Sequence, residues 1–293
     1  MFEKFKKNIY SQDGEDGILE EIFNRLKLEH LDKTCVEFGA ADGIFISNTY
    51  NLIKNKNYKA LLIEPDQIKF KKLQENIPDI KIIKINEFIE YDGDNSLDSF
   101  LTKYNFNVNF DFLSIDIDGN DYHIFESLKK FQPKVICIEY NNHIPNEVVF
   151  VQENNPKLKQ GSSALAIINL AITKGYLLTA MTNNNLIFTH KTYANHVLRG
   201  DKLDINSLRN KEISRNLIFI GYDGTIHTTK PINLHWHRIE IKKIQALPKI
   251  LQSYPEDYNL FQKIFYYYFL FKTNPKKYLS NPCKYFRYFL KKN

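Results

Sequence analysis

Acidic residues end two strand-like runs of the sequence, where carboxylates can bind a cation or accept a proton. The run FDFLSIDID ends in Asp116 and Asp118, and the run KVICIEYN carries Glu139. Alternation along an extended strand would place Asp116 and Asp118 on the same face. Because the carboxyl ends of adjacent parallel strands form the ligand crevice of an open sheet, we expect these carboxylates to converge.

Carboxylates held this close repel one another unless a cation lies between them. Asn141 and His143 follow Glu139 closely and extend the same set of polar side chains. Oxygen ligands with an optional imidazole suit Mg²⁺ or Mn²⁺. The sequence therefore predicts a divalent-metal site of Asp118, Glu139 and Asn141, with Asp116 and His143 as candidate catalytic bases.

The stretch Asp118-Gly119-Asn120-Asp121 is also typical of a turn that leads into a helix. We expect Asp121 to cap the helix DYHIFESLKKF rather than to bind a ligand. For His123, in the first turn of that helix, packing and function remain open.

A glycine-bearing loop follows the earlier run TCVEFGA. Its spacing is E-x-G-x-x-x-G, with Glu37, Gly39, Asp42 and Gly43 as the candidate cofactor-binding residues. Glycine allows the backbone to turn tightly and a ligand to lie close. Twenty-one residues beyond Gly43, the next run ends in Glu64. An acid at that strand end can accept both hydroxyls of a ribose.

The loop alone would also admit a dinucleotide, but two features favour a cationic cofactor. The third glycine of the dinucleotide pattern is missing, because Phe45 and Ile46 follow Gly43. The surroundings are acidic, which would repel a pyrophosphate and attract a sulfonium and an ammonium group. The acids upstream of the loop are Asp13, Glu15 and Asp16. We therefore expect S-adenosylmethionine as the cofactor.

Strand-like and helical segments alternate from Gly14 to Asn141, which predicts βαβ units and a parallel sheet. The strand runs are continuously apolar, as in a sheet covered on both faces. The runs YLLTAMT and NLIFTHK, separated by three asparagines, predict a hairpin. We predict an α/β, Rossmann-like class I methyltransferase fold: a mostly parallel seven-stranded sheet with an antiparallel hairpin, plus a C-terminal helical extension. Residues 1–230 would form the catalytic domain and residues 231–293 a basic aromatic extension.

The chain has three cysteines without metal or disulfide spacing, and its first residues lack an apolar signal segment. No apolar run reaches membrane-spanning length. These features predict a cytoplasmic protein. A small-molecule or sugar-nucleotide substrate is the expected partner.

Positive charge is concentrated at the C-terminal end. Residues 261–293 contain seven lysines, one arginine, twelve aromatic residues and no acid, whereas residues 1–260 contain 32 basic and 34 acidic residues. We therefore expect no nucleic acid as a partner of the body of the protein. The tail could lie on the inner face of a membrane, or pack against the body or a second subunit of a homo-oligomer. A membrane- or partner-binding protein is thus one alternative function.

Six motifs in a fixed order resemble the FkbM-like family of S-adenosylmethionine-dependent methyltransferases, over about residues 10 to 190. They are YSQDGEDGILEEIF, CVEFGAADG followed by SNTYNL, LLIEPD, DFLSIDIDGNDYHIF, IEYN and QGSSALAIINLAITKGYLL. The resemblance implies O-methylation, often of a sugar or glycan hydroxyl, and by analogy a nucleotide-linked precursor of a surface polysaccharide. It places Gln12 in a segment that closes over the cofactor, and it places Asp116 as a base beside metal ligands at Asp118 and Glu139. We also expect Asp116 among the cofactor-binding residues.

Two departures from the family pattern leave the acceptor open. His123 stands where relatives usually carry an aromatic residue, and Asn-Asn-His follows Tyr140. A second enzymatic alternative is a glycosyltransferase, because Asp116-Ile-Asp118 is also the D-x-D pattern that holds Mn²⁺ against a nucleotide-sugar diphosphate. No basic residue accompanies that motif, however, and a glycosyltransferase would leave the glycine loop unexplained.

Overall fold

The computed structural model describes residues 2–27, 30–200, 203–208, 217–234, 237–273 and 275–276. The chain forms two compact units, Met1–Lys211 (unit 1) and Glu212–Asn293 (unit 2). The division after residue 230 expected from the sequence stays a prediction. Of the basic aromatic tail, residues 274 and 277–293 lie outside the described residues.

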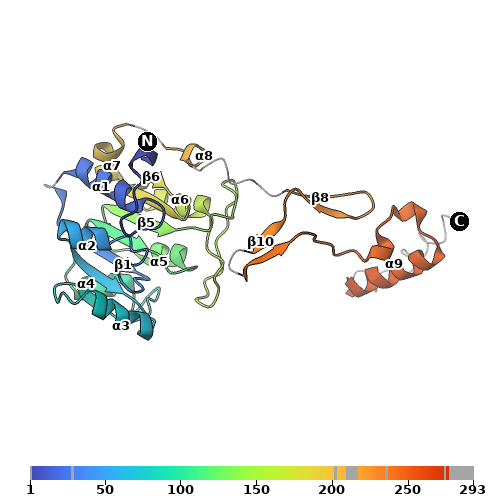
Figure 1. Ribbon diagram of the computed structural model, residues 1–293, viewed down its shortest axis with the longest axis horizontal. Coiled ribbons are helices and arrows are strands. Elements are labelled where there is room, and N and C mark those ends of the chain that lie inside the picture. The colour runs from blue at the N-terminus through green and yellow to red at the C-terminus, as the bar shows by residue number, and fades with distance from the viewer. Residues whose placement is uncertain are drawn as a thin grey trace. The chain divides into compact units, whose positions relative to one another are not determined.

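Unit 1 is built on one seven-stranded sheet with the strand order β3-β2-β1-β4-β5-β7-β6 (Figure 1). Strand β7 is antiparallel to both of its neighbours, and the other pairs are parallel. The strands are β1 Thr34–Phe38, β2 Lys59–Ile63, β3 Ile83–Ile85, β4 Phe112–Ile115, β5 Val135–Glu139, β6 Tyr176–Met181 and β7 Asn185–His190. The predicted Rossmann-like class I methyltransferase fold, with its hairpin, is confirmed.

Helices cover both faces of this sheet and divide the core in two. Buried residues of α4, α5 and α6 share one hydrophobic cluster, and those of α1, α2, α3 and α7 share the other. Alternate residues of β1 face opposite clusters, Val36 one and Cys35 the other. The helices are α1 Glu15–Leu26, α2 Tyr50–Lys56, α3 Gln67–Asn76, α4 Leu97–Lys103, α5 Asp121–Ser127, α6 Ala164–Thr173, α7 Lys191–Leu198 and α8 Ile205–Leu208.

Short polar residues begin several of these helices, as their sequences predict. The side chains of Asp66, Ser96 and Ser163 accept backbone N–H groups at the starts of α3, α4 and α6. Gly175, with φ +84°, follows α6 and allows the turn into β6. Between β5 and α6 the described chain forms neither helix nor strand, so a long loop follows β5.

The described part of unit 2 contains two small antiparallel hairpins and the helix α9 Leu260–Thr273. The hairpin strands are β8 Ile218–Ile220, β9 Ile226–Thr228, β10 Ile232–Leu234 and β11 Ile239–Ile241. The helical extension expected from the sequence is therefore present. Among the described residues, no helix is long and apolar enough to cross a membrane.

Candidate active site

Three carboxylates meet where β4 and β5 end. Single ligand atoms of Asp116, Asp118 and Glu139 all lie within 4.8 Å of one another. Strands β4 and β5 are adjacent, and Ile115 pairs with Ile138, so the residues that follow Ile115 come out beside Glu139. Asp118 is exposed, whereas Asp116 and Glu139 are partly buried.

A tight turn, and not strand alternation, brings Asp116 and Asp118 together. Strand β4 ends at Ile115, so the expectation that it continues to Asp118 is wrong. Asp118 has φ +56°, which reverses the chain direction. Asp121 holds this turn, because its carboxylate accepts the backbone N–H of Ile117 and of Gly119, each at 2.9 Å.

Asp121 is not the N-cap that the sequence predicted. The N-cap of α5 is Asn120, and Asp121 is the first residue of the helix. Its carboxylate is directed back to the preceding turn instead of to the N–H groups of α5. Asp121 is therefore a buried support of the acid cluster.

The charges of the cluster are poorly compensated by the protein. Burial, with Asp121 and Asp118 as further causes, raises the pKa of Asp116 to about 8. Burial, followed by the charge of Asp116, raises the pKa of Glu139 to about 9. A divalent cation between these oxygens would favour their ionised forms, and hard oxygen donors are what Mg²⁺ and Mn²⁺ bind. The donor set thus fits such an ion.

The loop after β1 packs against this cluster through its first glycine. Gly39 has φ +76°, and a Cβ there would lie 1.7 Å from the carbonyl oxygen of Asp116. Gly43 has φ +80°, and a Cβ there would lie 2.4 Å from Leu73 Cδ1 on α3. Protein atoms, and not a ligand, therefore take the room left by each missing side chain.

Glu37 and Asp42 support the loop through their carboxylates. Buried Glu37 accepts the hydroxyls of Ser47 and Thr49, each at 2.7 Å, and the backbone N–H of Asn48 at 2.8 Å. Burial raises the pKa of Glu37, although these hydrogen bonds oppose the shift. Asp42 Oδ1 accepts the N–H groups of residues 44 and 45. Their direct contact with a cofactor stays a prediction.

Glu64 stands immediately after β2, as expected for an acid that binds a ribose. It is buried, and its two carboxylate oxygens accept the backbone N–H of Ala41 and of Asp66, each at 2.8 Å. Since an ionised carboxylate has about four acceptor positions, two remain for other donors. Glu64 therefore links β2 to the cofactor loop and retains acceptor capacity for hydroxyl groups.

The acids upstream of the loop join the N-terminal segment to the same edge of the sheet. Glu15 Oε1 accepts Thr182 Oγ1 at 2.6 Å and Asn185 Nδ2 at 3.1 Å, and Asn185 pairs with Glu139 in the sheet. Asp16 Oδ2 accepts three consecutive backbone N–H groups, those of residues 9 to 11. Asp16 Oδ1 is buried and has no hydrogen-bond donor among the described residues. Gln12 lies exposed in this segment, and its role over the cofactor stays a prediction.

Asn141 and His143 lie in the loop that follows β5. Asn141 Nδ2 donates to the carbonyl of Gln160 at 2.7 Å, and Asn141 Oδ1 accepts the N–H of His143 at 2.9 Å. The carboxamide of Asn141 thus builds the loop, and its role as a metal ligand stays a prediction. His143 is exposed, and its role as a base also stays a prediction.

Gln152 was missed by the sequence analysis. Its side chain is 1% exposed, Oε1 accepts the N–H groups of Gln160 and Gly161, and Nε2 donates to Asn120 Oδ1 at 2.8 Å. His123 Nε2 lies 2.8 Å from the carbonyl of Gln152, which gives His123 a structural role. These bonds clamp the loop to the turn that carries Asp118. The sequence offers no signal for this role, because a single glutamine in a polar stretch belongs to no motif or periodic pattern.

Lys159 brings a positive charge to the same turn. Its ammonium donates to the carbonyl of Ile117 at 2.8 Å. No basic residue stands near the D-x-D pattern in the sequence, because Lys159 is more than forty positions away along the chain. The loop after β5 therefore supplies the hydrogen bonds of Gln152 and the positive charge of Lys159 to this turn.

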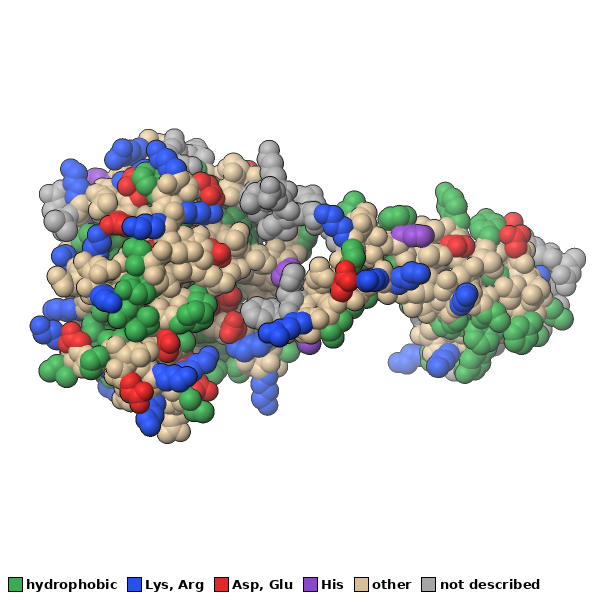
Figure 2. Space-filling view, viewed as in Figure 1, with side chains coloured by type: hydrophobic (Ala, Val, Ile, Leu, Met, Phe, Trp, Pro, Cys, Tyr) green, Lys and Arg blue, Asp and Glu red, His purple; other side chains and the backbone are tan. Residues whose placement is uncertain are grey.

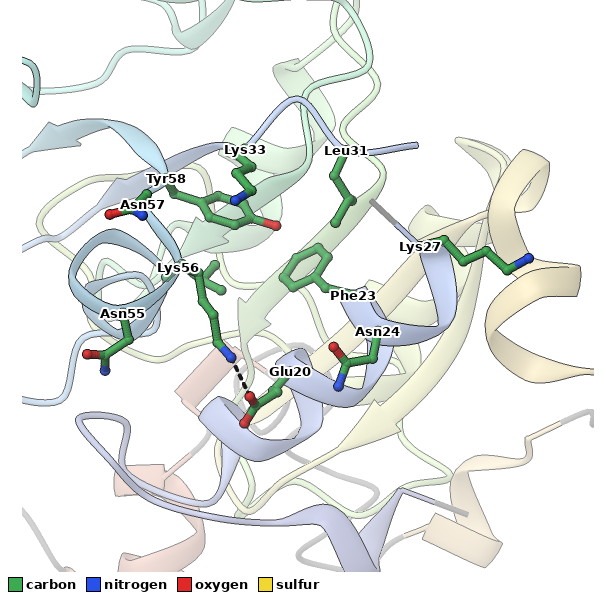
Figure 3. A pocket seen from close by; sticks show the side chains of 11 residues that line it. Glu20, Phe23, Asn24, Lys27, Leu31, Lys33, Asn55, Lys56, Asn57 and Tyr58 are labelled. Carbon is green, nitrogen blue, oxygen red and sulfur yellow. Dashed lines mark hydrogen bonds and ion pairs between the residues drawn. The ribbon is translucent and has the colours of Figure 1, made fainter. Parts of the chain in front are cut away.

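A pocket of about 310 Å³ lies at the opposite edge of the sheet (Figure 3). It opens between α1 and α2 and is lined by Phe23, Leu52 and Tyr58, among others, with the ion pair of Lys56 and Glu20 at 2.5 Å on its rim. Tyr58 directly precedes β2, whereas the candidate site follows the strands. None of the candidate site residues lines this pocket.

Residues 91–170 match the family model of the methyltransferase FkbM domain. The match covers 80 of the 293 residues. The matched stretch includes β4, the turn with Asp116 and Asp118, β5 and the loop held by Gln152. The FkbM-like resemblance of the sequence is thereby confirmed over these residues. No curated protein matches the sequence.

Three solved structures are similar to this chain at low sequence identity. The CMeT domain of the citrinin polyketide synthase has a TM-score of 0.40 and 9% identity, over 60% of this chain and 51% of that one. The carbon methyltransferase CurJ has a TM-score of 0.39 and 8% identity, over 62% and 56%. A SAM-dependent methyltransferase from Aquifex aeolicus has a TM-score of 0.33 and 11% identity, over 58% and 87%. The chain thus spans little more than half the length of the first two.

Proposed function

We propose that the FkbM-domain chain transfers the methyl group of S-adenosylmethionine to a hydroxyl oxygen of a sugar, with Mg²⁺ or Mn²⁺ bound at the acid cluster. The observation that carries this proposal is the convergence of Asp116, Asp118 and Glu139 beside the glycine loop. By the FkbM resemblance, the acceptor is a nucleotide-linked sugar that serves as precursor of a surface polysaccharide.

The electrostatics of the site support a cationic methyl donor. Glu37 and Glu15 lie near enough to Asp116 that their charges raise its pKa. S-adenosylmethionine, when bound, supplies an electrophilic methyl group on a sulfonium, and its ammonium adds a second positive charge. Both charges are attracted by this field. The unpaired oxygen Asp16 Oδ1 and the open acceptor positions of Glu64 suit its N–H and ribose O–H donors.

The acid cluster supports a metal-assisted acceptor site. A divalent ion, when bound there, would lower the pKa of a hydroxyl group that contacts it. The carboxylates of Asp118 and Glu139 would hold the ion, and the Gln152-anchored loop would position the sugar. Asp116 or His143 would accept the hydroxyl proton as the oxygen forms its bond to the methyl carbon, while the bond from that carbon to sulfur breaks and S-adenosylhomocysteine leaves with the electron pair. When donor and acceptor are aligned in one site, the activation barrier of a transfer falls by about 7–11 kcal/mol.

The glycosyltransferase alternative rests on Asp116-Ile-Asp118 alone. The FkbM match and the strand order of the sheet both favour methyl transfer. Lys159 is a cation beside the motif, and it bonds the carbonyl of Ile117 instead of standing free for a diphosphate. Methyl transfer therefore accounts for more of the observed site.

The test is calorimetric titration of the purified chain with S-adenosylhomocysteine, with and without Mn²⁺, followed by methyl transfer to sugar nucleotides. We expect a dissociation constant on the order of micromolar and transfer that stops when the metal is chelated. Absence of binding in both conditions would refute the cofactor assignment. Transfer that persists unchanged under chelation would refute the metal, and binding of a nucleotide sugar without S-adenosylhomocysteine would favour the glycosyltransferase.

A further inference from the structure

Helix α9 in unit 2 is apolar yet exposed. Its sequence is LFQKIFYYYFLFKT, and none of its residues is buried. Phe261 is 64% exposed, and Ile264 and Tyr268 are each 58% exposed. The spacings of three and four residues place these side chains on one face of the helix. Exposed apolar stripes of this kind mark interaction surfaces.

The described part of unit 2 has few buried apolar residues beside this face. Among its described residues, the buried hydrophobic ones are Leu251 and Tyr258. Among the described residues of the unit, α9 contacts the short turn Lys249–Leu251, where Gln262 Nε2 donates to the carbonyl of Ile250 at 2.8 Å, and its Tyr266 lies 5.8 Å from Tyr258 between ring centroids. In Figure 2, hydrophobic side chains gather over α9, with lysines beside them.

The charge of unit 2 is opposite in sign to that of unit 1. Residues 212–293 contain fourteen basic and five acidic residues, a net charge of +9, while residues 1–211 contain twenty-six basic and twenty-nine acidic residues, a net charge of −3. No acid follows Asp257. Lys263 and Lys272 lie within α9, next to the apolar residues.

We infer that α9 docks the chain on an anionic lipid surface, with its apolar face at the acyl boundary and its lysines at the headgroups. A second copy of the chain is a poor partner for this face, because two units of charge +9 repel each other. Nucleic acid would use the aromatic rings for stacking, but it would leave aliphatic Leu260 and Ile264 without a partner. An interfacial helix uses apolar and basic residues together, and the absence of acids removes repulsion from the anionic headgroups.

The test is cosedimentation of the full chain with vesicles of phosphatidylcholine, with or without phosphatidylglycerol. We expect binding to the anionic vesicles that weakens as salt is raised, and little binding to the neutral ones. The double variant Phe261→Ser/Ile264→Ser should bind the anionic vesicles at least about tenfold more weakly than the wild type, because two apolar side chains leave the interface. The matched control is Phe88→Ser/Ile80→Ser, which removes an exposed phenylalanine and an exposed isoleucine of unit 1 and should bind as the wild type does.

A second pair of variants tests the electrostatic part. Replacement of Lys263 and Lys272 by glutamine should weaken binding roughly fivefold for each lysine and reduce its salt dependence. Equal binding to neutral vesicles, or equal binding by all variants, would overturn the inference. So would self-association in sedimentation equilibrium, or RNA binding, that the Phe261→Ser/Ile264→Ser variant abolishes. Vesicle binding needs neither cofactor nor acceptor, so failure here is separate from failure of the proposed methyl transfer.

Discussion

Replacing Gln152 by alanine tests whether the loop after β5 positions the acid cluster. The change removes the side-chain acceptor of two backbone N–H groups, those of Gln160 and Gly161, and the donor to Asn120 Oδ1 and to the carbonyl of Leu158. A lost hydrogen bond costs about 1 kcal/mol, and a polar group left buried without a partner costs about 1–3 kcal/mol. Water can reach part of this exposed loop, so we expect the free energy of unfolding to fall by about 2–4 kcal/mol.

This loss leaves the protein folded, because a domain of this size has a stability of about 5–15 kcal/mol. The effect should reach the proposed metal site, since the hydrogen bonds of Gln152 hold the turn that carries Asp118. Supporting residues outside the ligand set change metal affinity by about 10–100-fold, and we expect the lower end of that range for Mn²⁺. Methyl transfer at low Mn²⁺ should fall in proportion and recover at high Mn²⁺.

The assays are urea unfolding followed by circular dichroism, and calorimetric titration with Mn²⁺. Gln160→Ala is the matched control, because Gln160 is an exposed glutamine of the same loop whose bonds to Asn141 and Gln152 are made by its backbone. It should leave both quantities close to those of the wild type. If Gln152→Ala also leaves stability and Mn²⁺ affinity unchanged, the loop does not support the cluster and the reasoning is refuted.

Three further results are expected. Gly39→Ala should destabilise the protein far more than Gly93→Ala in thermal unfolding: both residues have φ +76°, but a Cβ at Gly39 meets Asp116 at 1.7 Å and one at Gly93 meets nothing within 4 Å. Equal losses would show that backbone strain alone matters. Asp118→Asn should abolish Mn²⁺ binding in calorimetry with little change in stability, since Asp118 is exposed, whereas Asp94→Asn, at another exposed acid, should do neither. Without metal, melting temperature should fall as pH rises from about 5 to 9, because the raised pKa values of Asp116 and Glu139 mean that the folded state binds more protons than the unfolded state in that window. Mn²⁺ should flatten this profile, and a rise in melting temperature with pH would contradict the assigned burial of the two acids.

The local pattern of the sequence was enough to predict the sheet and the edge that carries the acids. Apolar runs and helical periodicities depend on near neighbours in the chain, so β1 to β7 could be placed before any tertiary contact was known. The convergence of Asp116, Asp118 and Glu139 followed from a general property of parallel sheets, that adjacent strands end at the same edge.

Contacts between distant residues decided the rest. The carboxylate of Asp121 turns back to the preceding turn, the space beside Gly39 is filled by the carbonyl of Asp116 just after the neighbouring strand β4, and Gln152 joins a loop to the turn before α5. Each depends on which backbone atoms lie within hydrogen-bond or van der Waals distance after folding. Residue type and spacing thus identified the candidate site residues and the edge of the sheet at which they lie. Only the tertiary structure decided which side chains support that chemistry, because packing brings together residues whose separation in sequence has no periodic pattern.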